Sequence, residues 1–305
     1  MIALFKKVLF LVLALPILCF AKEDINIIWG FSPSSGQATV LRIMIDDLNK
    51  TQSKYNFLFV NKQGAGGTIA ANTVTASPNS TVVGMSSSFF IRPYYESSNV
   101  VHNLNDFKPI IVQSLGSPLV FVSSKYSSMD QIDRNEKLSI GVSGLGTVSH
   151  LAANEFSKLF PNSITVNFKS MIDASVAAAG GHVDVAVMNY GDVAPLLSAQ
   201  KINVLSFTGS KNLFNLKNKK LSSLGVKDGE FLTVNYAIFA SNNMDAERYT
   251  EIQQLLLNAH KKQNIVSLHE SEMLSHVVYS DKENSTWYEK QKVFWKSKVD
   301  EVIKR

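Results

Sequence analysis

The segment from Gly141 to His150 (GVSGLGTVSH) sets glycines and hydroxyl side chains between an expected strand and an expected helix. Residues 138–142 have the β-branched, alternating character of a short strand. From Val148 onward, apolar residues recur with helical spacing. Thr147 and Ser149 lie where a helix leaves its first amides unpaired, and such a terminus attracts anions. The segment therefore predicts a binding site for a carboxylate or a phosphate.

A second segment of the same kind lies near the start of the chain. Residues 25–31 are typical of a strand and residues 32–36 (SPSSG) of a tight loop. The residues after the loop place their apolar side chains on one stripe of a helix and their charged side chains on the other face. Two such loops, far apart in the chain, suggest a ligand held between two lobes, which is binding without catalysis.

The candidate ligand-binding residues follow expected strands, because ligands of open α/β sheets bind beyond the carboxyl ends of the strands. They are Ser32, Ser34, Ser35, Gly36 and Gln37 of the first loop, Ser86 and Ser87 after the strand 81–85, Ser143, Gly144, Thr147, Ser149 and His150 of the second loop, and Met188 and Asn189 after the strand 183–188. Hydroxyls and backbone amides bind a carboxylate directly or through ordered water.

No catalytic group, metal site or cofactor is expected. His150 has no nucleophile at a spacing that would make it a general base. The other histidines, at positions 102, 182, 260, 269 and 276, show no metal-ligand spacing. Disulfides and thiol chemistry are excluded as well, because Cys19 is the only cysteine and lies in a segment expected to be removed.

Residues 1–21 are expected to form a cleaved signal peptide. Lys6 and Lys7 precede an apolar run that is too short to span a bilayer, and Ala21 precedes a polar segment. Cleavage after Ala21 leaves 284 residues (305 − 21), enough for two lobes. It also lowers the formal net charge from +5 to +3 by removing two lysines. Without a basic stripe carrying aromatic residues, nucleic acid is not an expected partner.

Seven segments together carry a resemblance to a known family. They are 31–42 (FSPSSGQATVLR), 61–71 (NKQGAGGTIAA), 105–109 (NDFKP), 118–122 (PLVFV), 141–151 (GVSGLGTVSHL), 168–170 (FKS) and 180–185 (GGHVDV). In this order and spacing the chain resembles the substrate-binding proteins of tripartite tricarboxylate transporters, the Bug family of periplasmic solute receptors.

The resemblance implies a type II periplasmic-binding-protein fold, an α/β fold with a ligand cleft between two lobes. Lobe 1 would be discontinuous, comprising residues 22–118 and 231–305, and lobe 2 would comprise residues 119–230. The two loops would act as pincers on one carboxylate, partly through water. A monomeric periplasmic receptor that passes a small organic anion to membrane permease subunits is therefore expected.

Two departures from the family pattern bear on specificity. Ala38 stands where the first loop usually carries an acidic residue, and Met188 stands where an aspartate often ends the strand of the second lobe. A buried ligand ammonium needs a partner, so loss of that aspartate favours a mono- or dicarboxylate or an uncharged carbonyl compound over an amino acid. Met188 would then form apolar wall. The alternative is that Met188 belongs to the core and another acidic residue serves.

Two other functions stay open. Gly144-x-Gly146 approaches a dinucleotide-binding motif, which would make the protein a secreted NAD(P)-dependent oxidoreductase, but its third position is Ser149 and Lys169 follows the next strand. A sensory receptor independent of transport would share every feature described above.

The remaining elements follow from periodicity and turn residues. Further strands are expected at 57–60, 81–85, 119–122, 164–168, 183–188, 203–207 and 233–240, and helices at 67–74, 173–179 and 193–199. Asp245 is expected to cap a helix that runs to about Gln263, and Ser285 to cap a last helix.

Overall fold

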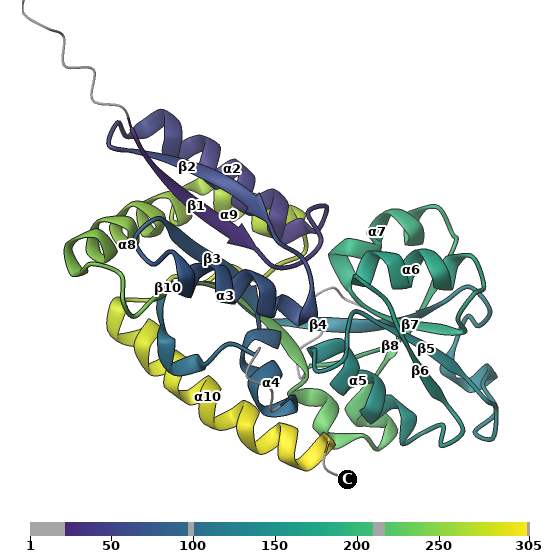
Figure 1. Ribbon diagram of the computed structural model, residues 1–305. Coiled ribbons are helices and arrows are strands. Elements are labelled where there is room, and N and C mark those ends of the chain that lie inside the picture. Colours follow the sequence, from purple (N-terminus) through teal and green to yellow (C-terminus); the bar gives the residue numbers. More distant parts are fainter. Residues whose placement is uncertain (1–21, 97–100, 210–216, 304–305) are drawn as a thin grey trace, which may run out of the picture.

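The computed structural model describes residues 22–96, 101–209 and 217–303, so the expected signal peptide, residues 1–21, lies outside the described residues. These residues form two α/β lobes that lie side by side (Figure 1). Among the described helices, none combines the length and the apolar character that a membrane crossing requires.

Lobe 1 contains four strands and six α-helices, and lobe 2 contains five strands and three α-helices, all counted among the described residues. Lobe 1 has β1 (Glu23–Trp29), β2 (Tyr55–Asn61), β3 (Thr81–Ser86), β10 (Thr233–Ser241), α2 (Gly36–Thr51), α3 (Thr68–Ala76), α4 (Ser88–Tyr95), α8 (Ala246–His260), α9 (Gln263–Ser271) and α10 (Asp281–Ile303). Lobe 2 has β5 (Ser139–Val142), β6 (Ile164–Asn167), β7 (Val185–Asn189), β8 (Asn203–Phe207), β9 (Lys219–Lys220), α5 (Val148–Ser157), α6 (Met171–Ala179) and α7 (Tyr190–Ser198).

One further strand, β4 (Phe107–Ser123), belongs to both lobes and joins them (Figure 1). Its first part pairs with β10 and its last part with β7 and β8, which gives the strand order β2-β1-β3-β10-β4-β7-β5-β6. Gly116 has a φ of +69° at an irregular point within the pairing of β4 with β10, a conformation that glycine adopts without strain. The sequence predicted only residues 119–122 of this strand.

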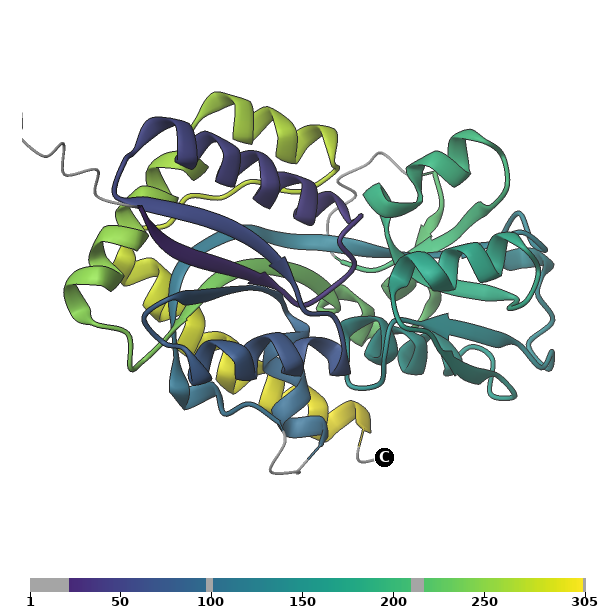
Figure 2. The same ribbon diagram turned by 45° about the horizontal axis from the view of Figure 1, so that its top comes forward.

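The larger of two hydrophobic clusters fills lobe 1 and continues into lobe 2, where it includes residues of β5 and α5. In lobe 1 the predicted apolar stripe of α2, which includes Leu41 and Met44, is fully buried against the strands. Figure 2 shows α2 and α9 together on one side of these strands and α10 on the opposite side. In lobe 2, Val120, Ala186 and Met188 are fully buried in a separate cluster. The limits of the lobes expected from the resemblance, with crossings near Pro118 and Phe231, stay a prediction.

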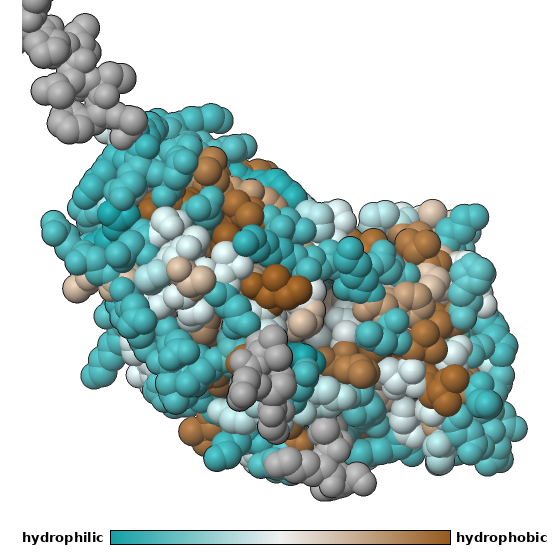
Figure 3. Space-filling view, in the orientation of Figure 1, coloured by the Kyte–Doolittle hydropathy of each residue, from teal (hydrophilic) through white to brown (hydrophobic). Residues whose placement is uncertain are grey.

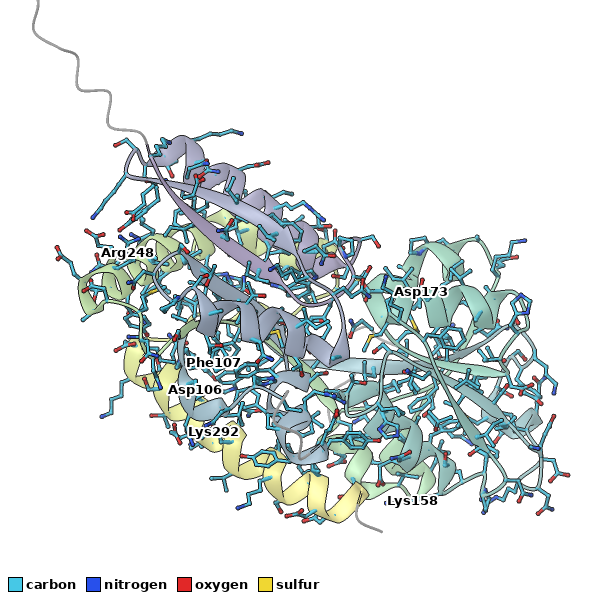
Figure 4. All side chains as sticks on the ribbon, viewed as in Figure 1. Asp106, Phe107, Lys158, Asp173, Arg248 and Lys292 are labelled. Carbon is cyan, nitrogen blue, oxygen red and sulfur yellow. The ribbon has the colours of Figure 1, made fainter. Side chains whose placement is uncertain are left out.

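The C-terminal helix α10 contacts both lobes away from the cavity. It packs on lobe 1, and near its end Lys298 Nζ donates to Asp228 Oδ1 at 3.2 Å. Asp228 also lies 3.8 Å from Lys158 Nζ of lobe 2, and Figure 4 places Lys158 beside the C-terminal end of α10. The junction between the lobes therefore carries ionic contacts as well as the strands.

The predicted helix starts are partly confirmed. Asp245 caps α8 as expected, since its side chain accepts from the backbone N–H of Arg248. The helix ends at His260, and α9 follows as a separate helix. Ser285 is not a cap, because α10 begins at Asp281 and Ser285 is an exposed residue within it.

The true start of α10 is a capping box formed by Ser280 and Glu283. The Glu283 N–H donates to Ser280 Oγ at 3.3 Å, and the Ser280 N–H donates to Glu283 Oε2 at 2.8 Å. Ser280→Ala should therefore lower the free energy of unfolding by about 1 kcal/mol. Ser285→Ala is the matched control and should leave the urea unfolding midpoint unchanged. Equal effects of the two variants would contradict this assignment.

Candidate functional site

A cavity of about 310 Å³ lies between the two lobes. This volume is at the lower end of the range of small-molecule sites, about 300–1,000 Å³. Its wall consists mainly of residues that follow the parallel strands of both lobes, where ligands of open α/β sheets bind. Lobe 1 contributes Trp29, Gly30, Phe31, Ser32, Ser35, Gln63, Gly64, Ala65, Gly66, Ser86, Ser88, Arg92, Val234 and Tyr236; lobe 2 contributes Ser143, Gly144, Leu145, Val148, Asn167, Phe168, Lys169, Ser170, Met171, Ile172, Asn189 and Asp192.

The N-terminal ends of five helices line this cavity. The lining residues are the caps or first residues of these helices: Ser35 of α2, Ser88 of α4, Val148 of α5, Ser170 of α6 and Asn189 of α7. Each N-terminus carries partial positive charge and backbone N–H groups without a helical partner. Because helices of both lobes meet here, the cavity favours an anion that bridges them.

Arg92 of α4 adds a buried cation to the wall. The residue is 7% exposed, and its Nη1 donates to the Leu145 carbonyl of lobe 2 at 2.8 Å. Its Nη2 forms an ion pair with Glu96, whereas its Nε has no hydrogen-bond partner among the described residues. A second cationic residue, Lys169, lines the cavity from lobe 2.

Asp192 of α7 places a carboxylate at the same cavity. Its Oδ1 accepts from the backbone N–H of Gly36 at 3.2 Å, and its Oδ2 accepts from Asn189 Nδ2 at 3.0 Å. Burial raises the pKa of Asp192, and the hydrogen bonds from Asn189 and Gly36 oppose that shift. Burial also raises the pKa of the neighbouring Glu272, with the charge of Asp192 adding to the effect. The cavity therefore contains a carboxyl group, and it comes from Asp192 rather than from the strand-end position that Met188 occupies.

Hydrogen bonds between the lobes surround the cavity. Besides the bonds of Gly36 to Asp192 and of Arg92 to Leu145, Gln63 Nε2 donates to the Lys169 carbonyl at 2.9 Å. Asn189 Nδ2 of lobe 2 also donates to the Tyr236 hydroxyl of β10 at 3.0 Å. The lobes are therefore in contact around the site, as in the closed form of a two-lobed receptor.

This architecture agrees with comparisons of the chain with known proteins. A family model described as "Tripartite tricarboxylate transporter family receptor" matches residues 40–301. The chain belongs to the tripartite tricarboxylate transporter receptor family. The match covers lobe 2 and most of lobe 1, and it begins after β1 and the first loop, whose residues Trp29 to Ser32 and Ser35 line the cavity.

Solved structures of similar fold include members of periplasmic receptor families. The periplasmic binding protein BugD superposes with a TM-score of 0.81 at 16% identity, covering 93% of this chain and 98% of that chain. An R. palustris protein with adipate gives a TM-score of 0.80 at 19% identity, covering 92% and 97%. MatC from Rhodopseudomonas palustris with bound malate gives 0.77 at 15% identity, covering 92% and 100%. No curated protein sequence matches the receptor.

The predicted site residues fall into two groups in the receptor. Six of them line the cavity: Ser32, Ser35, Ser86, Ser143, Gly144 and Asn189. The other eight do not: Ser34, Gly36, Gln37, Ser87, Thr147, Ser149, His150 and Met188. Whether any of the fourteen residues binds a ligand stays a prediction, and the eight residues of the second group lie outside the cavity wall in this conformation.

Most of the second group shape the loops. Thr147 caps α5, and Ser149 Oγ contacts the hydroxyls of both Ser143 and Thr147 at 2.9 Å. Gln37 Nε2 donates to Gln113 Oε1 at 3.1 Å in the core. Ser87 Oγ turns from the cavity to accept the Asn235 N–H, so the neighbouring Ser88 lines the wall instead.

His150 and Met188 lie outside the cavity. His150 Nδ1 accepts the Gly146 N–H at 3.1 Å, the ring packs edge-on against Tyr95, and burial lowers the pKa of the imidazole. Met188 is fully buried in the core of lobe 2 and does not form apolar wall as expected. Successive side chains of a strand point to opposite faces, which explains why Asn189 lines the cavity and Met188 does not.

Sequence reasoning missed Arg92, Asp192 and Tyr236. Arg92 is a single cation within an apolar run that was not predicted as a helix, and Tyr236 lies in the middle of a long strand. The sequence did contain a signal for Asp192. It is an acidic residue in the first turn of the helix that follows β7, shortly after the candidate residues Met188 and Asn189.

Proposed function

We propose that the receptor binds a small carboxylate between its lobes and delivers it to permease subunits of a membrane transporter. The observation that carries the proposal is the convergence of helix N-termini from both lobes, together with Arg92, on one cavity. The fold shared with the structures that hold adipate and malate supports a mono- or dicarboxylate ligand. An anion that touches both lobes stabilises the closed state over the open one, which is the mechanism of hinge closure.

The proposal includes no catalytic step. The dinucleotide alternative requires access to the loop Gly144–Gly146, and lobe 1 covers the second glycine of this loop, Gly146. A Cβ atom added to Gly146 would lie 2.7 Å from Tyr95 Cδ1 and 3.1 Å from Arg92 Nη1. A pyrophosphate needs close approach to both glycines, so the covered Gly146 and the small cavity favour a compact anion.

Delivery to a permease distinguishes a transport receptor from a sensor. Secretion through a signal peptide at residues 1–21 would place a monomeric receptor in the periplasm. On the face seen in Figure 3, apolar residues are scattered and do not form one continuous patch. Uptake of the ligand by cells that lack the receptor separates the two roles, because a transport receptor is required for uptake and a sensor is not.

The presence of Asp192 reopens the choice between carboxylates and amino acids. An ammonium group in the cavity would find a carboxylate partner there, so the sequence argument based on Met188 alone is insufficient. We still propose a ligand without an ammonium group, because Asp192 already accepts hydrogen bonds from Gly36 and Asn189.

A thermal-shift screen of the purified receptor tests this ligand class. A ligand at about 100 times its Kd adds about 2.7 kcal/mol to the folded state, so Tm should rise by at least about 4 °C. We expect this shift with C4–C6 dicarboxylates or related acids and not with NAD. A larger shift with aspartate or glutamate than with their deaminated analogues would overturn the assignment, and a shift with dinucleotides alone would overturn the receptor function.

A further inference from the structure

Three histidines that are separated in the sequence meet in lobe 1. His260 ends α8, His269 lies in α9 and His276 lies in the segment before α10 (Figure 1). One ring nitrogen from each comes within 4.8 Å of the other two. His260 and His269 are fully buried, and His276 is partly exposed. The sequence spacing gave no sign of this cluster, because the turn between α8 and α9 and the return of the chain after α9 create it.

Each imidazole uses one nitrogen to donate to a backbone carbonyl. His260 Nε2 lies 2.8 Å from the Val277 oxygen, His269 Nδ1 lies 2.9 Å from the Ile265 oxygen, and His276 Nε2 lies 3.0 Å from the His260 oxygen. A carbonyl oxygen only accepts, so these nitrogens carry the protons. This second hydrogen bond is what fixes the tautomer and orientation of metal-binding histidines.

The opposite nitrogens are then lone-pair donors. His260 Nδ1 and His269 Nε2 are buried and have no hydrogen-bond partner among the described residues. A buried acceptor without a partner costs about 1–3 kcal/mol, so two of them side by side need an explanation. Burial lowers the pKa of His260 to about 3 and that of His269 to about 4. The rings of His260 and His269 are therefore neutral at pH 7, as metal ligands must be.

We propose that His260, His269 and His276 form a binding site for a divalent transition metal of the zinc class. Imidazole nitrogens suit zinc, copper and nickel rather than calcium or magnesium. Three protein ligands leave a fourth tetrahedral position for water, and His276 is the partly exposed member of the three. Zinc–nitrogen bonds of about 2.0–2.1 Å bring tetrahedral ligand atoms to about 3.3 Å from one another, so small side-chain rotations complete the site.

A bound metal would stabilise a segment of lobe 1 that contacts the other lobe. The chain between His269 and His276 includes Glu272, whose carbonyl oxygen lies against Gly191 of lobe 2. It also includes Ser275, whose Oγ accepts the Leu115 N–H of the connecting strand β4 at 3.1 Å. A bound metal would hold this segment to α8 and thereby stabilise the surface on which lobe 2 closes.

Equilibrium binding of zinc and cobalt to the purified receptor, carrying no histidine tag, tests the site. We expect one equivalent of metal per chain, visible absorption of tetrahedral Co²⁺, and a rise in Tm with zinc that a chelator reverses. His269→Gln and His276→Gln should each weaken metal binding by more than about 100-fold, because loss even of outer partners costs about 10–100-fold. Exposed His182, in lobe 2 and outside the cluster, provides the control variant His182→Gln.

The partly exposed position of His276 keeps the test valid if a buried variant fails to fold. His276→Gln should retain the circular dichroism of the parent and its thermal shift with the organic anion, which separates this site from the cavity. Absence of a stoichiometric metal, or an unchanged metal Kd in His276→Gln, would overturn the proposal. Equal weakening by His182→Gln would also overturn it, since the metal would then bind elsewhere.

Discussion

Replacing Arg92 with methionine is expected to weaken binding of the organic anion by about 100-fold or more. The side chain is nearly buried, lines the cavity and donates to the Leu145 carbonyl of lobe 2. The substitution removes both the cation that faces the ligand and a bond that holds the closed form. Truncating one partner of a buried, hydrogen-bonded charge pair costs about 2–5 kcal/mol, and each 1.4 kcal/mol is tenfold in Kd.

Isothermal titration with the best acid from the thermal-shift screen measures this effect. Arg92→Lys keeps the charge but loses the planar donor geometry, so it should restore only part of the affinity. Arg42→Met is the matched control, since the Arg42 guanidinium of α2 lies 4.2 Å from the centroid of the Phe59 ring and does not line the cavity. A Kd for Arg92→Met within about threefold of the parent would show that the anion does not bind at this wall.

The parts of the fold that the sequence predicted are local ones. The loop from Ser143 to Thr147 can be predicted from adjacent residues alone, because a short strand, glycines and a capping hydroxyl follow one another in the sequence. The apolar stripe of α2 is equally local. Such elements are read from periodicity and capping alone, and six of the fourteen predicted site residues therefore line the cavity.

The parts that were missed depend on contacts between distant residues. β4 is buried along most of its length and carries Pro118 and Gly116, so it shows neither strand alternation nor a continuous apolar run. Arg92 lies at the cavity beside the other lobe, where its Nη1 donates to the Leu145 carbonyl, and no local sequence pattern encodes this contact. The cluster of His260, His269 and His276 likewise forms through the packing of α9 on α8, and no sequence motif predicts this packing.

Met188 and Asp192 show how an acidic group can reach the cavity from outside the strand end. The family resemblance implies a ligand-facing carboxylate at the strand end before α7, and this sequence has Met188 there. The carboxylate is supplied four positions later, because the first turn of α7 brings Asp192 back to the cavity. A residue in the first turn of a helix can thus supply a carboxylate where the strand end does not. Inspection of the strand end alone therefore misses a carboxylate of the site.

Gly191→Ala is expected to weaken ligand binding by about 10–100-fold while leaving each lobe folded. Gly191 lies in α7 of lobe 2, and a Cβ atom there would lie 2.3 Å from the carbonyl oxygen of Glu272 in lobe 1. A backbone oxygen cannot rotate away as a side chain can, so the closed form carries the strain of an overpacked contact, about 1–3 kcal/mol. Opening of the lobes removes the contact, and the substitution therefore shifts the population toward the open form.

This prediction separates closure from direct ligand contact, because Gly191 does not line the main cavity. The Tm of the ligand-free protein should be unchanged or slightly higher, since alanine favours a helix over glycine by about 1 kcal/mol. Gly180→Ala is the control within lobe 2, where the added Cβ would meet mainly the exposed His182 ring at 3.1 Å. Small-angle scattering with saturating ligand should show contraction of the parent and of Gly180→Ala, and less contraction of Gly191→Ala. Full contraction of Gly191→Ala with an unchanged Kd would mean that the contact between Gly191 and Glu272 is not part of the ligand-bound state. Closure of lobe 2 onto the segment between His269 and His276 would then be wrong.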